Sequence, residues 1–266
     1  FDCPVLSDLW EGTPCPEDRP RCTRNIYLDI GANIGACLLQ MLARPDVERS
    51  IAFEPNAANL FYLSSGVLAN KDLAGKLSLF PVGIGKGRST HAVYEEIGNA
   101  GNTALGRKTA EHTRVTGNVE VVTLDSVLME GSRPPPYIHL VKMDVQGFEG
   151  AVLQGASRLL QSGAVGTWKF EATSWMLESQ GSSAAEVFNS FTASGYFIFE
   201  VGSRVPLRDV ELATYACRTE RLERDFVATR TAPKSSTSPQ RTIDCRREVH
   251  SMDAESALSA LWNFFR

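Results

Sequence analysis

The chain has 266 residues, 43% of them hydrophobic and 22% charged, which is enough apolar material to bury a sizeable globular core. Its formal net charge of -4 lacks the basic excess that neutralises phosphates, so broad binding to nucleic acid is not favoured. No apolar run approaches the roughly 20 residues of a membrane-spanning helix. Because the first residue is Phe1 rather than Met, we expect a processed or truncated chain whose missing part had room for a signal or anchor.

Residues 1–24 are rich in proline and cysteine and show no regular period, so we interpret them as an irregular N-terminal arm. Five cysteines lie in the two flanks of the chain: Cys3, Cys15, Cys22, Cys217 and Cys245. Their spacing includes no CxxC pair, which argues against zinc. We predict that at least one disulfide ties down the arm or links Cys217 with Cys245, which would favour the secretory-pathway lumen or the extracellular space. Free thiols in a cytosolic enzyme are the alternative.

Regular secondary structure begins after the arm. We predict strands over residues 26–30, 50–53 and 77–82, and helices over 34–43 and from about Pro55 to Ala69. Cys37 lies inside the first of these helices and is predicted to pack there as a small hydrophobic residue. Residues 83–118 are rich in Gly, Asn, Thr and charged residues, so we expect a long loop that crosses the sheet edge and the cleft.

The second half of the chain continues the alternation of strands and helices. We predict strands over residues 119–124, 138–145, 167–172, 196–201 and 226–228, and helices over 149–161 and 184–193. This alternation implies an α/β fold with a doubly wound, mainly parallel sheet that helices cover on both faces. We therefore expect one domain over residues 25–230. Residues 231–266 are expected to form a C-terminal tail, with a polar linker and a short amphipathic helix at 253–265.

Ligands of such sheets bind beyond the carboxyl ends of the strands, and the first candidate there is the turn DIGANIG, which spans Asp29 to Gly35. Gly31 and Gly35 allow a tight turn and a close approach of the backbone to a ligand. The turn lacks the G-x-G-x-x-G pattern of dinucleotide sites, and Asp29 would repel phosphates but attract an ammonium group, directly or through water. A plain tight turn capped by Asp29 is the alternative.

The second candidate is Glu54, which ends the second predicted strand about 20 residues beyond the glycine-rich turn, where an acid accepts both ribose hydroxyls of a nucleoside. A carboxylate that stabilises the dipole of the next helix is the alternative, and the two roles are compatible.

The third candidate comprises charged side chains on two strands. Strand parity places Lys142 and Asp144 on one face, and Lys169 and Glu171 repeat the pattern on the strand that is predicted to pair with it. Buried charges persist only when they are paired, so we infer one network of these four residues at the floor of the cleft. It would orient a carboxylate towards the reacting centre. A purely structural salt bridge is the alternative.

Taken together, these motifs resemble a known family. The runs YLDIGANIG, FEPN, VVTLDSVL and LVKMDVQGFEGAVLQGA, within residues 26–201, are similar to the FkbM family of methyltransferases. The resemblance implies the Rossmann-like, seven-stranded class I methyltransferase fold, S-adenosyl-L-methionine as cofactor and, usually, O-methylation. Acceptors in the family include hydroxyls of sugars and of polyketide-type natural products. We therefore expect a small-molecule or glycan acceptor, and no particular oligomeric state is indicated.

The resemblance also implies site residues. Those that match the first cofactor motif are Asp29, Gly31, Asn33 and Gly35. The ribose-binding acid is matched by Glu54, with Asn56 beside it. The fourth-strand motif is matched by Asp144, Gly147 and Glu149.

Methyl transfer to a hydroxyl needs a group that accepts the proton, and a positioned base typically contributes about 10²–10⁴-fold. The family usually has D-V-E-G where this chain has Gln146 in the third position, and Gln is not a base. We therefore take Asp144 as the first choice of base and Glu149 as the second. Lys142 and Glu171 complete the expected catalytic group.

Other polar residues are weaker candidates. His139 begins its predicted strand and should lie at the wrong end of the sheet. The 83–118 segment contains four residues that would reach over the cleft: His91, Asn99, Asn102 and His112. A metal-dependent variant would carry an Asp-Asn pair where this chain has Glu171-Ala172, so we expect no catalytic metal.

Two other functions stay open. An NAD-type Rossmann oxidoreductase would use a similar sheet, although the G-x-G-x-x-G pattern is missing. A non-catalytic, cofactor-binding relative would keep the fold, and Gln146 would then mark the loss of activity.

Overall fold

The computed structural model describes residues 3–13, 26–108, 110–129, 135–217, 222–230 and 242–246. Its main sheet runs in the order β10-β11-β9-β8-β1-β2-β3. The strands are β1 (Ile26–Ile30), β2 (Arg49–Phe53), β3 (Leu77–Phe80), β8 (Ile138–Met143), β9 (Val165–Thr173), β10 (Phe197–Glu200) and β11 (Glu223–Thr229). Only the pairings of β11 within this sheet are antiparallel. The seven-stranded, mainly parallel α/β fold expected from the sequence is therefore confirmed.

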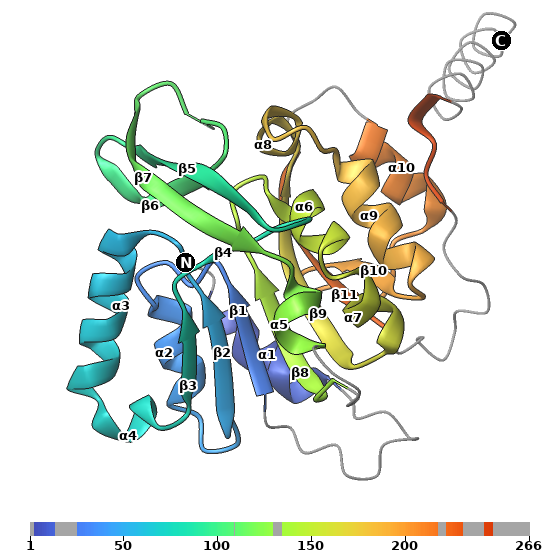
Figure 1. Ribbon diagram of the computed structural model, residues 1–266. Coiled ribbons are helices and arrows are strands. Elements are labelled where there is room, and N and C mark those ends of the chain that lie inside the picture. Colours follow the sequence, from blue (N-terminus) through green and yellow to red (C-terminus); the bar gives the residue numbers. More distant parts are fainter. Residues whose placement is uncertain are drawn as a thin grey trace, which may run out of the picture.

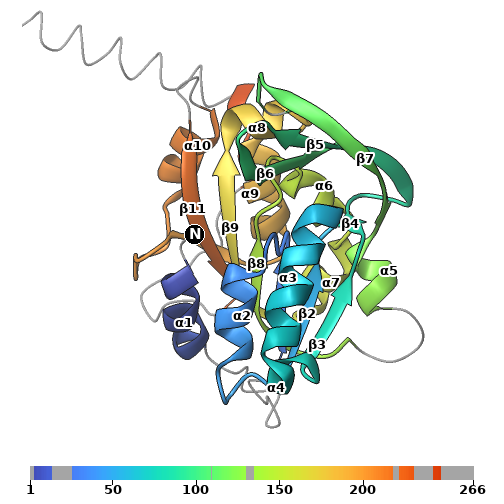
Figure 2. The same ribbon diagram turned by 90° about the vertical axis from the view of Figure 1, so that its left-hand side faces the viewer.

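Helices cover both faces of the main sheet (Figure 1). One face carries α1 (Cys3–Gly12), α2 (Ala36–Leu42) and α3 (Ala57–Ala69), which lie side by side in Figure 2. The other carries α6 (Glu149–Gln154), α7 (Ser157–Ser162) and α9 (Ala184–Ala193). Neighbouring residues of a strand point to opposite faces. Tyr27 therefore packs in the cluster with α1 to α3, and Leu28 packs in the cluster with α7 and α9.

The described part of the chain has four further helices: α4 (Lys71–Ala74), α5 (Leu124–Leu128), α8 (Ser174–Ser179) and α10 (Asp209–Cys217). The helix predicted over residues 149–161 is divided into α6 and α7. The Asp125 carboxylate accepts hydrogen bonds from the backbone N–H groups of Arg158 and Leu159, both at 2.9 Å. This tertiary contact supplies the acceptors that an interrupted helix needs at its new start.

A second sheet replaces the loop predicted over residues 83–118. Its strands are β4 (Gly83–Ile84), β5 (Ser89–Glu96), β6 (Asn99–Leu105) and β7 (Thr113–Val122), in the order β4-β7-β5-β6. Of the predicted strand 119–124, residues 119–122 form the end of β7, whereas Thr123 caps α5 and Leu124 begins it. Few side chains of this flap, defined as β4 to β7, are buried, so its strands carry little hydrophobic alternation. Three that are buried, Val93, Leu105 and Val121, pack against Phe148.

The N-terminal segment is more regular than predicted, because residues 3–12 form α1. Cys3, Leu6 and Trp10 lie on its buried side. Cys3 forms a disulfide with Cys37, so the interpretation of Cys37 as a simple core residue was wrong. A second disulfide joins Cys217 to Cys245, and the prediction of bridges in the flanks is thereby confirmed.

Cys15, Cys22, the predicted linker at 231–241 and the predicted helix at 253–265 lie outside the described residues. Among the helices that the structure does describe, none is long and apolar enough to cross a bilayer. The two disulfides are consistent with an oxidising compartment.

Candidate functional site

The turn after β1 and the end of β2 meet at Glu54. Its Oε2 accepts a hydrogen bond from the backbone N–H of Asn33 at 2.7 Å, and its Oε1 accepts one from the backbone N–H of Asn56 at 2.8 Å. The side-chain amide of Asn59 lies 3.4 Å from the same Oε1. Burial raises the pKa of Glu54 above its ordinary value, although the N–H groups of Asn56 and Asn33 oppose that rise. The contacts hold the carboxylate in one orientation and leave lone pairs for a ligand.

Gly31 lets the carboxyl ends of β1 and β8 approach each other. Its φ is 83°, and a Cβ built on it would lie 2.0 Å from the backbone oxygen of Asp144. A side chain is therefore excluded at this position. Gly35 has a different role, since its missing Cβ makes room for Leu63 of α3 and not for a ligand.

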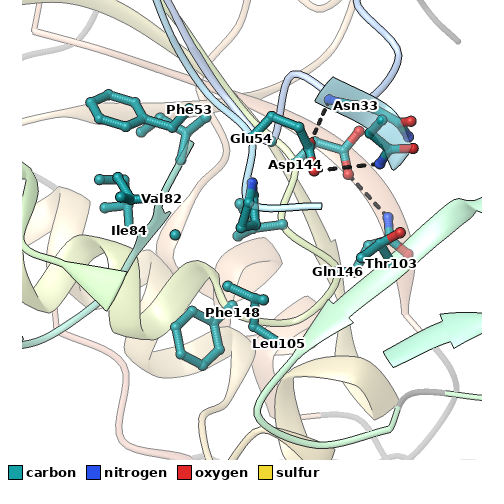
Figure 3. A pocket seen from close by; sticks show the side chains of 16 residues that line it. Asn33, Phe53, Glu54, Val82, Ile84, Thr103, Leu105, Asp144, Gln146 and Phe148 are labelled. Atoms are coloured by element: carbon teal, nitrogen blue, oxygen red, sulfur yellow. Dashed lines mark hydrogen bonds between the residues drawn. The ribbon is translucent and has the colours of Figure 1, made fainter. Parts of the chain in front are cut away.

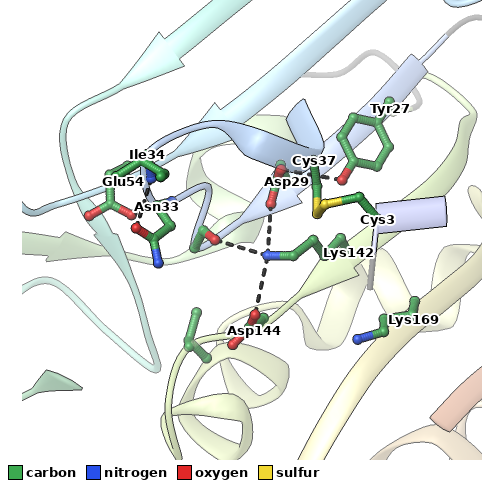
Figure 4. A network of polar contacts seen from close by, with 12 residues as sticks. Cys3, Tyr27, Asp29, Asn33, Ile34, Cys37, Glu54, Lys142, Asp144 and Lys169 are labelled. Carbon is green, nitrogen blue, oxygen red and sulfur yellow. Dashed lines mark hydrogen bonds and ion pairs between the residues drawn. A yellow bond between two sulfur atoms is a disulfide. The ribbon is translucent and has the colours of Figure 1, made fainter. Parts of the chain in front are cut away.

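Lys142 joins the two strand ends below this turn (Figure 4). Its Nζ lies 3.3 Å from Asp29 Oδ1, 3.0 Å from the backbone oxygen of Gly31 and 3.5 Å from Asp144 Oδ2. The Tyr27 hydroxyl donates to Asp29 Oδ2 at 3.2 Å. Burial lowers the pKa of Lys142, but Asp29 and Asp144 outweigh it and hold the ammonium charged.

The structure places Asp29 behind Lys142, with no exposed surface. The residue is completely buried and lies between Tyr27 and Lys142. Burial raises its pKa, and the neighbouring Lys142 ammonium only partly offsets this rise. We therefore assign Asp29 the role of positioning Lys142, which in turn holds Asp144.

Asp144 is the charged residue that emerges from this network. Its side chain is 28% exposed, and its Oδ1 accepts a hydrogen bond from Gln146 Nε2 at 3.0 Å. Burial raises the pKa of Asp144, but the Lys142 ammonium, the Gln146 amide and Lys169 together bring it below its ordinary value. The carboxylate is therefore ionised at neutral pH.

A pocket, which we call the strand-end pocket, opens above these residues (Figure 3). Its polar lining includes Gly31, Asn33, Glu54, Thr103, Asp144 and Gln146. Its apolar lining includes Phe53, Val82, Ile84, Leu105 and Phe148. The polar and apolar groups gather on opposite sides of it in Figure 3. The pocket can therefore take a ligand that has both a flat apolar part and a polar, charged part.

The flap closes one side of the strand-end pocket, where Thr103 and Leu105 of β6 reach its wall. Asn56 holds this contact, because its Nδ2 donates to Thr103 Oγ1 at 3.0 Å while its Oδ1 caps α3. Through Thr103 and Leu105, the segment 83–118, which was expected to reach over the cleft, lines this wall of the pocket. The sequence analysis missed Asn59, Thr103, Leu105 and Phe148. For Asn59 a signal existed, since it follows Asn56 by three positions on a predicted helix.

The predicted network of four charges is divided in the structure. Lys142 pairs with Asp144 as expected, but Lys169 pairs with Asp225 of β11. Glu171 instead accepts a hydrogen bond from the Thr173 hydroxyl at 2.7 Å. The reason is that β11 inserts beside β9 and places Asp225 opposite Glu171 in the ladder.

Glu149 lies away from the strand-end pocket. The residue is 2% exposed, and its Oε1 accepts a hydrogen bond from the backbone N–H of Val145 at 3.1 Å. Its Oε2 has no hydrogen-bond partner among the described residues. Burial raises the pKa of Glu149 to about 8. The side chain therefore supports the loop between β8 and α6, in which Gln146 and Gly147 both have positive φ.

The three histidines that the structure describes lie outside the strand-end pocket. His139 is buried at the start of β8, and its Nε2 donates to the backbone oxygen of Trp10 at 2.7 Å. His91 contacts the outer side of the Phe148 ring, and His112 precedes β7. The side chains of Asn99 and Asn102 lie outside the described part of the structure. Among the described residues, no group of three or more His, Cys, Asp or Glu side chains is arranged to hold a metal ion.

The sequence of this region matches a known family: residues 29–198, more than half of the chain, match the methyltransferase FkbM domain. The chain belongs to the FkbM methyltransferase family. Membership implies S-adenosyl-L-methionine as the methyl donor in general. No curated protein matches the chain in sequence.

Solved methyltransferase structures are similar to this FkbM family member at low sequence identity. The FkbM methyltransferase from Methylobacillus flagellatus KT is 16% identical with a TM-score of 0.46, and the likeness covers 82% of this chain and 49% of that one. The METTL16 MTase domain is 11% identical with a TM-score of 0.44, covering 87% and 84%. StiE O-MT is 10% identical with a TM-score of 0.39, covering 79% and 56%. The chain thus spans about half the length of the Methylobacillus protein.

The residues of the strand-end pocket fit the cofactor of this family. Gly31 lines the pocket with bare backbone at the end of β1, because a Cβ there would meet the backbone oxygen of Asp144. The Glu54 carboxylate is fixed by two backbone N–H groups and suits a pair of ribose hydroxyls. The apolar wall around Ile84 and Phe148 suits an adenine ring.

Proposed function

We propose that the chain is an S-adenosylmethionine-dependent O-methyltransferase whose acceptor is a hydroxyl on a sugar or on another small-molecule or glycan compound. The observation that carries the proposal is the position of Asp144, which lines both the strand-end pocket and a second hollow beside it. A carboxylate shared by two hollows can face the methyl donor on one side and accept a proton from the acceptor on the other.

Separate groups of the chain would hold the cofactor. Glu54 would accept hydrogen bonds from the ribose hydroxyls, and Gly31 and Asn33 would line the polar end with backbone atoms. When bound, the cofactor supplies a methyl group on a positively charged sulfur, and the carbon–sulfur bond breaks as the acceptor oxygen bonds to the carbon. The flap residues Thr103 and Leu105 would exclude water from this side of the pocket.

Asp144 is the residue that we assign as proton acceptor. Its low pKa keeps it ionised, and Lys142 and Gln146 hold its two oxygens from two sides. Glu149 is the weaker candidate, because it lines neither hollow and its pKa of about 8 keeps it mostly protonated at neutral pH. We assign Glu149 to positioning the loop that carries Asp144 and Gln146.

Calorimetry and a turnover assay with the Asp144→Asn variant test the proposal. We expect S-adenosylmethionine and S-adenosylhomocysteine to bind with micromolar affinity, about -8 kcal/mol, and NAD not to bind. With labelled cofactor and a panel of simple glycosides, Asp144→Asn should lower kcat by at least about 100-fold, because asparagine accepts no proton at neutral pH. The asparagine keeps the shape of the side chain, so cofactor affinity should change little.

Glu149→Gln is the matched comparison, since it makes the same chemical change in the neighbouring carboxylate. Its kcat should stay within about tenfold of the wild type. Binding of NAD in place of S-adenosylmethionine would contradict the cofactor assignment. A large loss in Glu149→Gln with near-normal turnover in Asp144→Asn would reverse the roles of the two residues. If the cofactor binds but no glycoside is methylated, the assignment of a sugar acceptor would be contradicted and the cofactor assignment would stand.

A further inference from the structure

The second hollow, which we call the acidic hollow, lies at the carboxyl ends of β8, β9 and β10 and at the start of β11. Its wall carries five carboxylates, namely Asp144, Glu171, Glu200, Glu223 and Asp225. The cations in the same wall are Lys169 and Arg224. Because Asp144 also lines the strand-end pocket, a molecule in the acidic hollow would meet the group bound in that pocket at Asp144.

Both cations of the acidic hollow are already paired with acids. Lys169 is 6% exposed and forms an ion pair with Asp225. Arg224 lies 3.0 Å from Glu200 and stacks over the ring of Tyr215, whose hydroxyl also bonds to Glu200. An incoming anion would have to compete with Asp225 for Lys169 and would share the Arg224 guanidinium with Glu200.

The acids, in contrast, are only partly compensated. No lysine or arginine of the described chain forms an ion pair with Glu171 or Glu223. Within the described residues, Glu171 has one hydrogen-bond donor, the Thr173 hydroxyl. Burial raises its pKa most, and the charges of Asp144 and Asp225 add to the rise, while the Thr173 hydroxyl and Lys169 oppose it without cancelling it. A cation placed there would relieve the repulsion among these carboxylates.

Resting on the function proposed above, we propose that the acceptor bears an ammonium group, as an amino sugar does, and that Glu171 binds this group while Asp144 faces the hydroxyl to be methylated. Anionic acceptors are disfavoured, because the wall carries five carboxylates against two cations. The specificity of the enzyme is then electrostatic, since the ammonium fixes the ring on the Glu171 side and turns a hydroxyl towards Asp144.

Three matched glycosides test this proposal by binding alone: methyl glucosaminide, methyl glucoside and methyl glucuronide, which are cationic, neutral and anionic at pH 6.5. Saturation-transfer NMR with the S-adenosylhomocysteine-loaded protein measures each Kd. We expect the glucosaminide to bind at least about tenfold more tightly than the glucuronide, with the glucoside between them. Glu171→Gln should reduce this ratio at least about threefold, and added salt should reduce it as well.

Glu48→Gln is the control, because it removes the same charge at an exposed position before β2, at the opposite edge of the sheet. It should leave the ratio of the two Kd values unchanged. A glucuronide that binds as tightly as the glucosaminide would overturn the proposal, and so would a ratio that Glu171→Gln does not alter in a protein with wild-type melting temperature. The order of the three Kd values is measured without methyl transfer. A result that contradicts the ammonium-binding proposal is therefore distinct from a failure of cofactor binding or of turnover.

Discussion

The fold shifts the pKa values of two carboxylates, five positions apart in the sequence, in opposite directions. Asp144 ends up beside Lys142 and Gln146, so its pKa falls below the ordinary value despite its burial. Glu149 points into the protein beneath the same loop, where burial raises its pKa to about 8. A single strand-to-helix connection thus separates a charged group at the cleft from an uncharged one below it. The pair follows the general pattern in which environment, and not residue type, assigns roles to neighbouring acids.

Glu149 should make stability depend on pH in a defined direction. Its pKa is higher in the folded protein than its ordinary value of 4.5, so the folded state keeps a proton that the unfolded state has lost. Its contribution is fully present below about pH 4.5 and is lost as the pH rises towards about 8, with a slope of at most about 1.4 kcal/mol per pH unit. Glu149→Gln should remove this slope.

Urea denaturation of both proteins at intervals from pH 5 to pH 8 measures the difference. The variant carries a constant offset of about 1–3 kcal/mol for its buried amide, so the slope and not the offset is diagnostic. A difference between variant and wild type that stays constant across this range would show that Glu149 ionises normally.

At the level of elements, the site depends on how closely the ends of β1 and β8 approach. The parallel register of these strands brings the turn at Gly31 against the loop that starts at Asp144. On the other side of that loop, a Cβ at Gly147 would lie 2.5 Å from the backbone oxygen of Met176. The loop with Asp144 and Gln146 is therefore held between two backbone contacts that exclude side chains.

Gly31→Ala should disrupt this arrangement. The substitution combines a φ of 83° with a Cβ position 2.0 Å from the Asp144 backbone oxygen. We expect the free energy of unfolding to fall by more than about 2 kcal/mol and cofactor affinity to fall at least tenfold. Urea denaturation and calorimetry measure the two effects.

Gly75→Ala is the matched control, since Gly75 has a φ of -66° and nothing lies within 4 Å of its Cβ position. That variant should be neutral or more stable by about 0.4–1 kcal/mol. If both alanine variants behaved alike, the close approach of β1 and β8 would not be what requires glycine.

For the whole molecule, disulfides join segments that the sheet alone does not connect. Cys3–Cys37 fastens α1 to α2 across a sequence separation of 34, and Cys217–Cys245 fastens α10 to the segment after β11. The first bridge fixes a helix whose Trp10 is completely buried and whose backbone receives the hydrogen bond from His139. The N-terminal segment is thus part of the core on this face.

Replacing Cys3 and Cys37 together by serine should lower the free energy of unfolding by about 2–4 kcal/mol, as expected for a loop of this length. Urea denaturation without reductant measures the loss, and peptide mapping of alkylated, non-reduced protein identifies the bridges. The single substitution Asp8→Ala at an exposed position of α1 serves as a control and should change stability little. Free alkylation of Cys3 and Cys37 in the native protein would contradict the pairing.

The sequence by itself determined the α/β sheet and the strand-end location of its polar residues. Alternating strands and helices force a parallel sheet, and the carboxyl ends of parallel strands share one edge, so Gly31, Glu54 and Asp144 had to gather there. The glycine turn after β1 and the acid Glu54 could also be predicted, because each depends on a local feature of the sequence. The turn requires a positive φ, and the acid stands at the end of a strand.

Only the tertiary structure decided which partners these residues meet. Lys169 pairs with Asp225 because β11 is inserted antiparallel between β9 and β10, a topology that no local pattern encodes. The flap was not predicted because β7 is mostly exposed and β5 buries only Val93 and Glu95, so strand pairing and not hydrophobic alternation makes them strands. Cys37 looked like any core residue until α1 packed beside α2 and brought Cys3 to it. In each case the deciding partner is distant in the chain, and only the packing of whole elements brings it near.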